Sequence, residues 1–174
     1  KCVNNSATVI ANNIEYFSDK IIIATGSKPN CISNFSFNHR DFISSDDLLK
    51  CEELPKSILI IGSGAIGVEW ATILNEFGVN VLVIEMAERL APSCDIDISS
   101  RIERIFKMKK IKFYKNVTLL EFNSNIAKLS NGENIICDKV LCAAGRRPVL
   151  TQIDGVDLKI NADCTTNVNN LYVT

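Results

Sequence analysis

The stretch Ile58–Glu85 reads ILIIGSGAIGVEWATILNEFGVNVLVIE, and its pattern decides the fold. Ile58–Ile61 is a continuous apolar run, as expected for a strand that is buried on both faces of a parallel sheet. Three glycines follow at a spacing that predicts a tight turn into a helix. The helix is expected to begin at Ala65. A second buried strand, Val81–Ile84, then leads to the acid that ends the stretch.

A strand, a glycine turn, a helix, a strand and an acid, in this order, form the pattern that binds a dinucleotide. Gly62 permits the sharp turn, Gly64 lets a pyrophosphate approach the backbone, and Gly67 lets the helix pack on the strand. The start of the helix offers free N–H groups and the positive end of its dipole to that pyrophosphate. We therefore predict an α/β fold with a Rossmann-like, parallel-sheet domain.

Glu85 indicates which dinucleotide this domain binds. A carboxylate at the tip of the second strand accepts hydrogen bonds from the hydroxyls of the adenosine ribose and repels a 2′-phosphate. A site for NADP more often offers an arginine at this point. Here the nearest base is Arg89, which follows another acid, Glu88. The sequence therefore predicts NAD as the cofactor.

The composition is that of one globular domain of ordinary size. The chain has 174 residues, of which 47% are hydrophobic and 22% are charged, and its formal net charge is −1. This charge gives no reason to expect nucleic acid or an anionic membrane as a partner. The segment Ser57–Leu74 is long and nearly uncharged, but its glycine turn and Glu69 favour strand, turn and helix over a membrane span.

The seven cysteines are scattered and form no short metal-binding pair, which predicts reduced thiols in a cytoplasmic setting. Cys137 and Cys142 have the spacing of a redox pair. On one extended strand, however, they would point to opposite faces and lie roughly 16 Å apart, too far for a disulfide. We therefore expect them to be structural thiols.

Several further elements follow from periodicity and turn signals. Apolar residues recur with helical period along the helix that begins at Ala65, and they predict the face by which it packs on the sheet. A second set of apolar residues with the same period predicts another helix after Glu85. The residues of the two faces are Ile66, Trp70, Ile73, Leu74 and Phe77, and then Ile98, Ile102, Ile105 and Phe106. Three short strands, Val117–Phe122, Ile126–Leu129 and Asn134–Cys137, leave no room for helices between them. They predict a three-stranded antiparallel meander in place of a crossover helix.

Taken together, these motifs resemble the pyridine nucleotide–disulfide oxidoreductase family, and most closely its dihydrolipoamide dehydrogenase branch. The matching segments are IIIATGSKP, LPKSILIIGSGAIGVEWATIL, VNVLVIE, AAGRRP and TTNVNNLYVT. The resemblance implies a parent flavoenzyme, a homodimer with FAD and NAD, that oxidises dihydrolipoamide carried on an acyltransferase complex. It also implies that a redox-active cysteine pair precedes Lys1 and that a His–Glu base follows Thr174, so no catalytic or metal-binding residue is expected in this chain.

The resemblance divides the chain into three segments. Residues 1–53 and 146–174 would be pieces of a FAD domain, and residues 54–145 would be the NAD-binding domain. Glu69 would lie on the nicotinamide side, and Val117 would lie beside the adenine or simply in the core. Gly145 would let the nucleotide pass the strand that returns before it. The full set of implied cofactor-binding residues is Gly62, Gly64, Ala65, Ile66, Gly67, Glu69, Glu85, Val117 and Gly145.

Two alternatives to this function remain open. The parent could be another enzyme of the family, such as an NADH oxidase or a mercuric reductase-like protein. The chain could instead be a stand-alone NAD-binding or interaction module without redox chemistry. Residues outside the chain would separate the enzymes from one another, since fold alone does not determine function.

Overall fold

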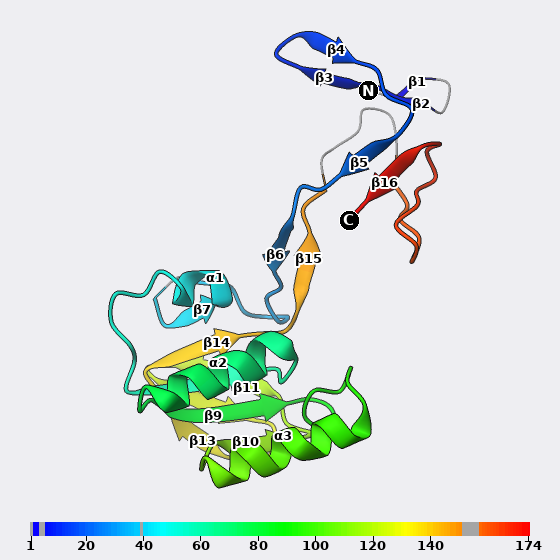
Figure 1. The fold of residues 1–174 in the computed structure, drawn as a ribbon. Coiled ribbons are helices and arrows are strands. Elements are labelled where there is room, and N and C mark those ends of the chain that lie inside the picture. Colours follow the sequence, from blue (N-terminus) through cyan, green and yellow to red (C-terminus); the bar gives the residue numbers. More distant parts are fainter. Residues whose placement is uncertain (1, 4–5, 39, 151–156) are drawn as a thin grey trace. The chain divides into compact units, whose positions relative to one another are not determined.

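A computed structural model describes residues 2–3, 6–38, 40–150 and 157–174 of the chain. The chain forms two compact units (Figure 1). The first unit comprises residues 1–28 and 147–174, and the second comprises residues 29–146. Parts of the expected flanking segments, and the single histidine His39, lie outside the described residues.

The second unit is built on a sheet of five parallel strands in the order β10-β9-β8-β14-β7. The strands are β7 (Phe42–Ser44), β8 (Ser57–Ile61), β9 (Asn80–Glu85), β10 (Lys112–Lys115) and β14 (Lys139–Cys142). The centres of β7, β8, β9 and β14 are buried, as the apolar run Ile58–Ile61 predicts for β8, whereas the edge strand β10 is half-buried. The predicted α/β fold with a parallel sheet is therefore confirmed.

The compact unit that holds the glycine turn begins at residue 29. It therefore includes residues 29–53 together with residues 54–145. The reason is that β7 pairs in parallel with β14 and completes the edge of the five-stranded sheet. The short helix α1 (Ser45–Leu48) follows, and Ser44 and Asp47 close a capping box at its start.

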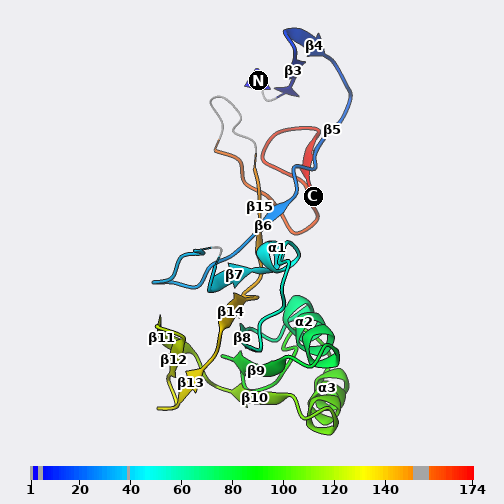
Figure 2. The ribbon, with the colours of Figure 1, turned by 90° about the vertical axis from the view of Figure 1, so that its left-hand side faces the viewer.

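Two layers cover this sheet, one on each face (Figure 2). The helices α2 (Ala65–Glu76) and α3 (Ile96–Met108) lie on one face. A meander of β11 (Leu119–Asn123), β12 (Ile126–Leu129) and β13 (Asn134–Ile136) lies on the other. The meander is antiparallel in the order β11-β12-β13, as predicted, and β12 and β13 are joined through Gly132 in a left-handed conformation.

The face by which α2 packs differs from the prediction. Ile73 and Phe77 were expected to face the sheet, but they are 43% and 70% exposed. The buried residues are instead Gly67, Ala71 and Leu74, one stripe along the helix. Of the predicted face, Leu74 is buried and Trp70 packs partly buried against the same core cluster. Gly67 and Ala71, which are small, let the helix backbone approach the strands closely, so the packing face is turned toward them.

Two further expectations need correction. The sequence did not indicate β10, the edge strand of the sheet. The expectation that Cys137 and Cys142 face opposite sides of a strand is wrong, because both pack in the core between the sheet and the meander. Cys137 lies in the connection between β13 and β14, so the two residues do not share one extended strand.

The first unit consists of short strand pairs. Their bounds are β1 (Cys2–Val3), β2 (Ser6–Ala7), β3 (Val9–Ala11), β4 (Ile14–Tyr16), β5 (Ile21–Ile23), β6 (Ser27–Pro29), β15 (Arg146–Pro148) and β16 (Leu171–Val173). β1 pairs with β2 and β3 with β4, both antiparallel, and β5 pairs in parallel with β16. β6 is the neighbour of β15. The side chains of β3 and β4 are exposed throughout.

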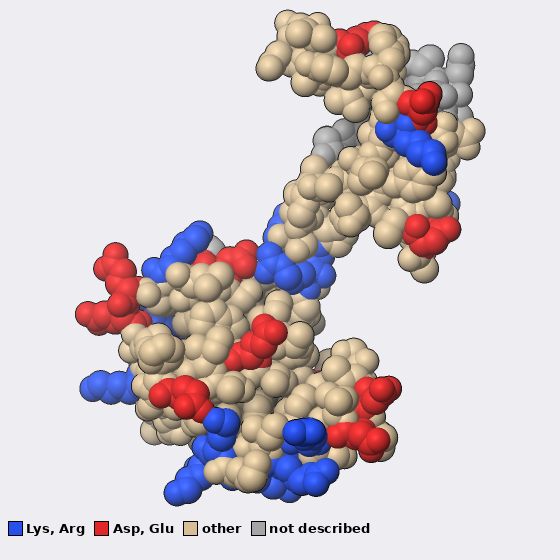
Figure 3. All heavy atoms as spheres, viewed as in Figure 1, with Lys and Arg blue, Asp and Glu red and all other residues tan. Residues whose placement is uncertain are grey.

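Acidic and basic side chains alternate over the visible surface of the second unit, and neither sign dominates (Figure 3). Within the described part of the chain, no helix is long and apolar enough to cross a membrane.

Candidate functional site

The glycine turn after β8 is shaped by two close backbone approaches. Gly62 has a φ of +93°, and its N–H donates a hydrogen bond to the carbonyl oxygen of Ile84 at 2.8 Å. A Cβ on Gly62 would lie 2.7 Å from the carbonyl oxygen of Ala143, and one on Gly67 would lie 2.0 Å from the oxygen of Gly62. Glycine is therefore required at both positions by the fold itself.

Gly64 differs from these two glycines because it faces open space. It is the N-cap residue of α2, where no side chain caps the helix. A Cβ on Gly64 would meet no atom within 4 Å. The first N–H groups of a helix have no partner within the helix and favour an anion. This arrangement leaves room for a phosphate group directly at the start of α2.

The carboxylate of Glu85 is buried at the end of β9, with a residue exposure of 5%. Its Oε2 accepts hydrogen bonds from the backbone N–H of Ser63 at 2.8 Å and from Ser63 Oγ at 2.6 Å. Its Oε1 accepts one from the N–H of Ala87 at 2.9 Å. A carboxylate offers about four lone-pair positions, so about one remains for a ligand.

A cavity of about 550 Å³ connects these groups. It is lined by Ile32, Ser33, Asn34, Ile61, Gly62, Gly64, Ile84, Glu85, Met86, Val117, Thr118, Leu119, Ala143, Ala144 and Gly145. Among the described residues of this lining, Glu85 has the only charged side chain. The cavity thus combines apolar walls with a few polar groups, as is usual for a cofactor site.

The predicted site residues are partly brought together here. Those that line the cavity are Gly62, Gly64, Glu85, Val117 and Gly145. Ala65 and Ile66 form the first turn of α2 beside it, Gly67 is buried beneath the turn, and Glu69 is exposed one helical turn further on. Val117 is also part of the core, so its packing role and its place in the cavity wall coincide.

Sequence reasoning missed two parts of the cavity. Ser63 is fully buried and binds Glu85, and its place between two motif glycines could have suggested such a contact. The segment Ile32–Asn34 forms one wall, and nothing in its composition points to a ligand. The backbone N–H of Asn30 donates to the carbonyl oxygen of Gly145 at 3.0 Å, which holds this segment beside the end of β14.

Arg89 was the base nearest to Glu85 in the sequence, and the structure assigns it other partners. Its guanidinium donates to the carbonyl oxygens of Pro92 at 2.6 Å and Cys94 at 2.7 Å. It also donates to Ser99 Oγ at 2.8 Å, at the start of α3. Because these bonds hold it in the loop before α3, Arg89 is not among the residues that line the cavity.

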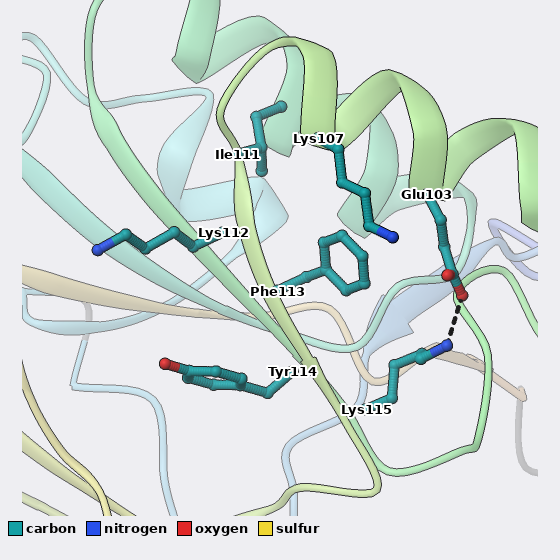
Figure 4. A pocket seen from close by; sticks show the side chains of 7 residues that line it. All are labelled: Glu103, Lys107, Ile111, Lys112, Phe113, Tyr114 and Lys115. Carbon is teal, nitrogen blue, oxygen red and sulfur yellow. Dashed lines mark hydrogen bonds and ion pairs between the residues drawn. The ribbon is translucent and has the colours of Figure 1, made fainter.

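A second cavity of about 430 Å³ lies at the free edge of the sheet, along β10 and the end of α3 (Figure 4). It is shallow, and Phe113 and Lys107 point toward it while Lys112 and Tyr114 extend to the other side of the strand. Lys115 Nζ forms an ion pair with Glu103 at 2.9 Å. This cavity contains none of the predicted site residues.

Among proteins of known sequence, the chain is similar to dihydrolipoyl dehydrogenases. It is 33% identical to that of Bacillus subtilis over an alignment that covers 88% of this chain and 36% of the relative. It is 34% identical to that of Buchnera aphidicola, with 99% of this chain and 38% of the relative covered. The chain therefore spans well under half the length of these relatives.

Among solved structures, the fold matches LpdA from Mycobacterium tuberculosis with a TM-score of 0.79 at 19% identity, over 95% of this chain and 40% of that one. It also matches an NAD-dependent persulfide reductase from A. fulgidus with a TM-score of 0.75 at 22% identity, over 97% and 35% of the two chains. The model of the pyridine nucleotide-disulphide oxidoreductases matches residues 1–174. The chain belongs to this family of oxidoreductases, which bind FAD and NAD(P).

Proposed function

We propose that this chain is the NAD(H)-binding part of a flavin-dependent dihydrolipoamide dehydrogenase. The observation that carries the proposal is the position of Glu85 and Gly64 around one cavity. Gly64 leaves space for a pyrophosphate at the start of α2, and Glu85 supplies the only charge in the cavity lining. A buried carboxylate, with no basic side chain among the described residues that line the cavity, favours the hydroxyls of NAD over the 2′-phosphate of NADP.

The choice of dihydrolipoamide among the possible substrates rests on similarity alone. Relatives at 33% and 34% identity carry the name dihydrolipoyl dehydrogenase. Matching folds at lower identity include a persulfide reductase and the flavoprotein disulfide reductase RclA of Escherichia coli. Fold does not determine substrate within such a family, so sequence similarity is what favours dihydrolipoamide.

In this proposal the chain's own residues bind and orient the nucleotide. The N–H groups at the start of α2 hold the pyrophosphate, and the remaining lone pair of Glu85 accepts a ribose hydroxyl. Val117 and Leu119 supply the apolar wall. The bound cofactors supply the electron-transfer chemistry. Glu69, exposed on α2, is assigned to the nicotinamide side.

The domain assignment is part of the same proposal. Residues 54–145 would be the NAD-binding domain, and residues 1–53 and 146–174 would contribute to a FAD domain. The parent would act in the cytoplasm as a homodimer on lipoyl groups of an acyltransferase complex. A redox-active cysteine pair and a His–Glu base would come from other parts of that parent.

Two experiments test the proposal, one for the choice of nucleotide and one for the choice of substrate. Calorimetric titration of the 174-residue chain is expected to give an affinity for NADH at least about tenfold higher than for NADPH, or about 1.4 kcal/mol. Equal affinities would refute the role of Glu85. For the parent protein, reduction of NAD by dihydrolipoamide is expected to exceed that by coenzyme A or a persulfide; the reverse order would refute the substrate assignment and leave the nucleotide site intact.

A further inference from the structure

Cys31 and Cys142 are far apart in the sequence and lie together beside the nucleotide cavity. Cys142 ends β14, and its thiol lies 3.5 Å from the carbonyl oxygen of Asn30, the residue that precedes Cys31. Cys31 packs against the core cluster that contains Cys142. Its own thiol donates to the carbonyl oxygen of Phe35 at 3.2 Å. The fold therefore brings the two thiols to one place.

The backbone next to Cys31 is held against the end of β14. The carbonyl oxygen of Asn30 lies 3.5 Å from the Cys142 thiol, and the Asn30 N–H donates to the carbonyl oxygen of Gly145 at 3.0 Å. Burial raises the pKa of Cys31, and the neighbouring Cys142 raises it further. A disulfide requires about 2.05 Å between its sulfurs, so the two side chains must turn toward each other for the bond to form.

We propose that Cys31 and Cys142 are a redox pair, a modification site at which a low-molecular-weight disulfide such as oxidised glutathione introduces a disulfide bond. The two thiols differ in access in the way that such a reaction needs. Cys31 is half-buried and can be reached from solvent, whereas Cys142 is only 2% exposed. Cys31 is therefore the thiol that reacts first with the disulfide in solution, and Cys142 is the thiol that resolves the mixed disulfide.

The reaction balances without any further reagent. The Cys31 thiolate attacks one sulfur of oxidised glutathione, the S–S bond breaks, and one glutathione leaves. The Cys142 sulfur then attacks the Cys31 sulfur of the mixed disulfide, and the second glutathione leaves. Two protein thiols are oxidised to one disulfide, one glutathione disulfide is reduced to two thiols, and the two protons end on the released glutathiones.

The bond would fix one wall of the nucleotide cavity. Ile32–Asn34 follow Cys31 directly, and Ala143–Gly145 follow Cys142 directly; both segments line the cavity. A backbone hydrogen bond from Asn30, just before Cys31, to Gly145 holds the two stretches of chain together. A covalent link between the two segments closes a long loop, which stabilises a folded chain mainly by restricting its unfolded state.

Peptide mapping tests the proposal directly. After oxidation with glutathione disulfide and alkylation, trypsin releases Cys31 in the peptide 21–40 and Cys142 in the peptide 140–146, with no other cysteine in either. The expected product is one disulfide-linked pair of these two peptides, lost on reduction. Recovery of Cys31 only as its glutathione adduct, or linked as often to the exposed Cys94 as to Cys142, would overturn the proposal.

Thermal melts supply a second measurement that does not depend on digestion. Oxidation is expected to raise the Tm of the chain by about 5–15 °C, and dithiothreitol is expected to reverse the rise. Cys31→Ser and Cys142→Ser should each abolish it. Cys51→Ser is the matched control, because Cys51 is half-buried like Cys31 but packs on the other face of the sheet, and it should leave the rise intact. An unchanged Tm after oxidation of the unsubstituted 174-residue chain would contradict the proposal.

Discussion

Ser63 Oγ donates a hydrogen bond of 2.6 Å to Glu85 Oε2, and both groups are buried. The backbone N–H of Ser63 reaches the same oxygen at 2.8 Å. The carboxylate is thus held by the residue between the first two glycines of the turn. This contact fixes which side of the carboxylate remains free, and so it orients Glu85 toward the cavity.

The contact continues into the loop that precedes α3. The N–H of Ala91 donates to the carbonyl oxygen of Ser63 at 3.0 Å and to its Oγ at 3.2 Å. The carbonyl oxygen of Ala91 in turn accepts from Ser99 Oγ at 3.2 Å. Fully satisfied polar networks of this kind make a site rigid. The glycine turn, the end of β9 and the loop are therefore held as one piece.

Ser63→Ala is expected to weaken NADH binding while the chain stays folded. The substitution removes the Oγ bond and leaves the Glu85 carboxylate less well oriented, at a cost of about 1–2 kcal/mol in binding, or roughly 5- to 30-fold in Kd. Calorimetry measures this directly. Thr72→Ala is the control, because its hydroxyl donates to the carbonyl oxygen of Val68 within α2 and Thr72 does not line the described cavity, so the substitution should leave Kd unchanged. Equal Kd values for Ser63→Ala and the parent chain would show that the contact does not orient the carboxylate.

Substitution of two glycines of the turn is expected to separate binding from folding. Gly64→Val places its side chain in open space and should leave the Tm nearly unchanged, while NADH affinity falls at least about tenfold because the pyrophosphate position is filled. Gly67→Ala places a Cβ against the Gly62 carbonyl and should destabilise the chain by about 1–3 kcal/mol or more. Thermal melts with and without NADH measure both effects. If NADH raises the Tm of Gly64→Val as much as it raises the Tm of the unsubstituted chain, the turn is not the nucleotide site.

Stability is expected to fall at alkaline pH because of Cys137. Burial raises the pKa of its thiol from 9.0 to about 11. The folded chain keeps this proton at a pH where the unfolded chain loses it, so the free energy of unfolding is unaffected below pH 9 and falls between pH 9 and pH 11, by about 2 kcal/mol. Urea unfolding at about pH 8 and about pH 11 checks this. Cys137→Ala should remove that part of the loss and the exposed Cys94→Ala should not; the same loss in all three chains would contradict the assignment.

Asp138 is expected to hold the start of β8. Its Oδ2 accepts hydrogen bonds of 2.9 Å from the backbone N–H groups of both Lys56 and Ser57. Asp138→Ala should lower the free energy of unfolding by about 2 kcal/mol, since it removes charge-assisted bonds to two backbone donors. Asp138→Asn keeps an oxygen acceptor and should lose about half as much. Denaturant unfolding measures the two values, and an unchanged midpoint for the alanine variant would refute the role.

The glycine turn and the strands around it were predictable because their signals are local. The spacing of Gly62, Gly64 and Gly67 marks the turn, and the apolar run of β8 has the composition of a strand covered on both faces. The packing face of α2 was not predictable from hydrophobicity. Close approach to the sheet selects Gly67 and Ala71, while the larger Ile73 and Phe77 remain exposed.

The features that the sequence did not indicate are long-range ones. The edge strand β10 is short and has a lysine at each end, so it shows no clear alternation of apolar and polar residues and no flanking glycine or proline that would predict a strand. The pairing of β7 with β14 brings residues 29–53 into the second unit, and the same topology places Cys31 beside Cys142. Such contacts depend on the order of strands in the sheet, which no local pattern encodes.

The central claim is that NADH binds at the glycine turn, and NMR titration of the 174-residue chain tests it most directly. The backbone resonances of Gly62–Gly67, Glu85, Val117 and Gly145 are expected to shift with NADH, and to shift much less with NADPH at the same concentration. Residues Lys107–Lys115 at the second cavity should not respond (Figure 4). Shifts confined to Lys107–Lys115, or the absence of any shift at Gly64 and Glu85 with saturating NADH, would contradict the account.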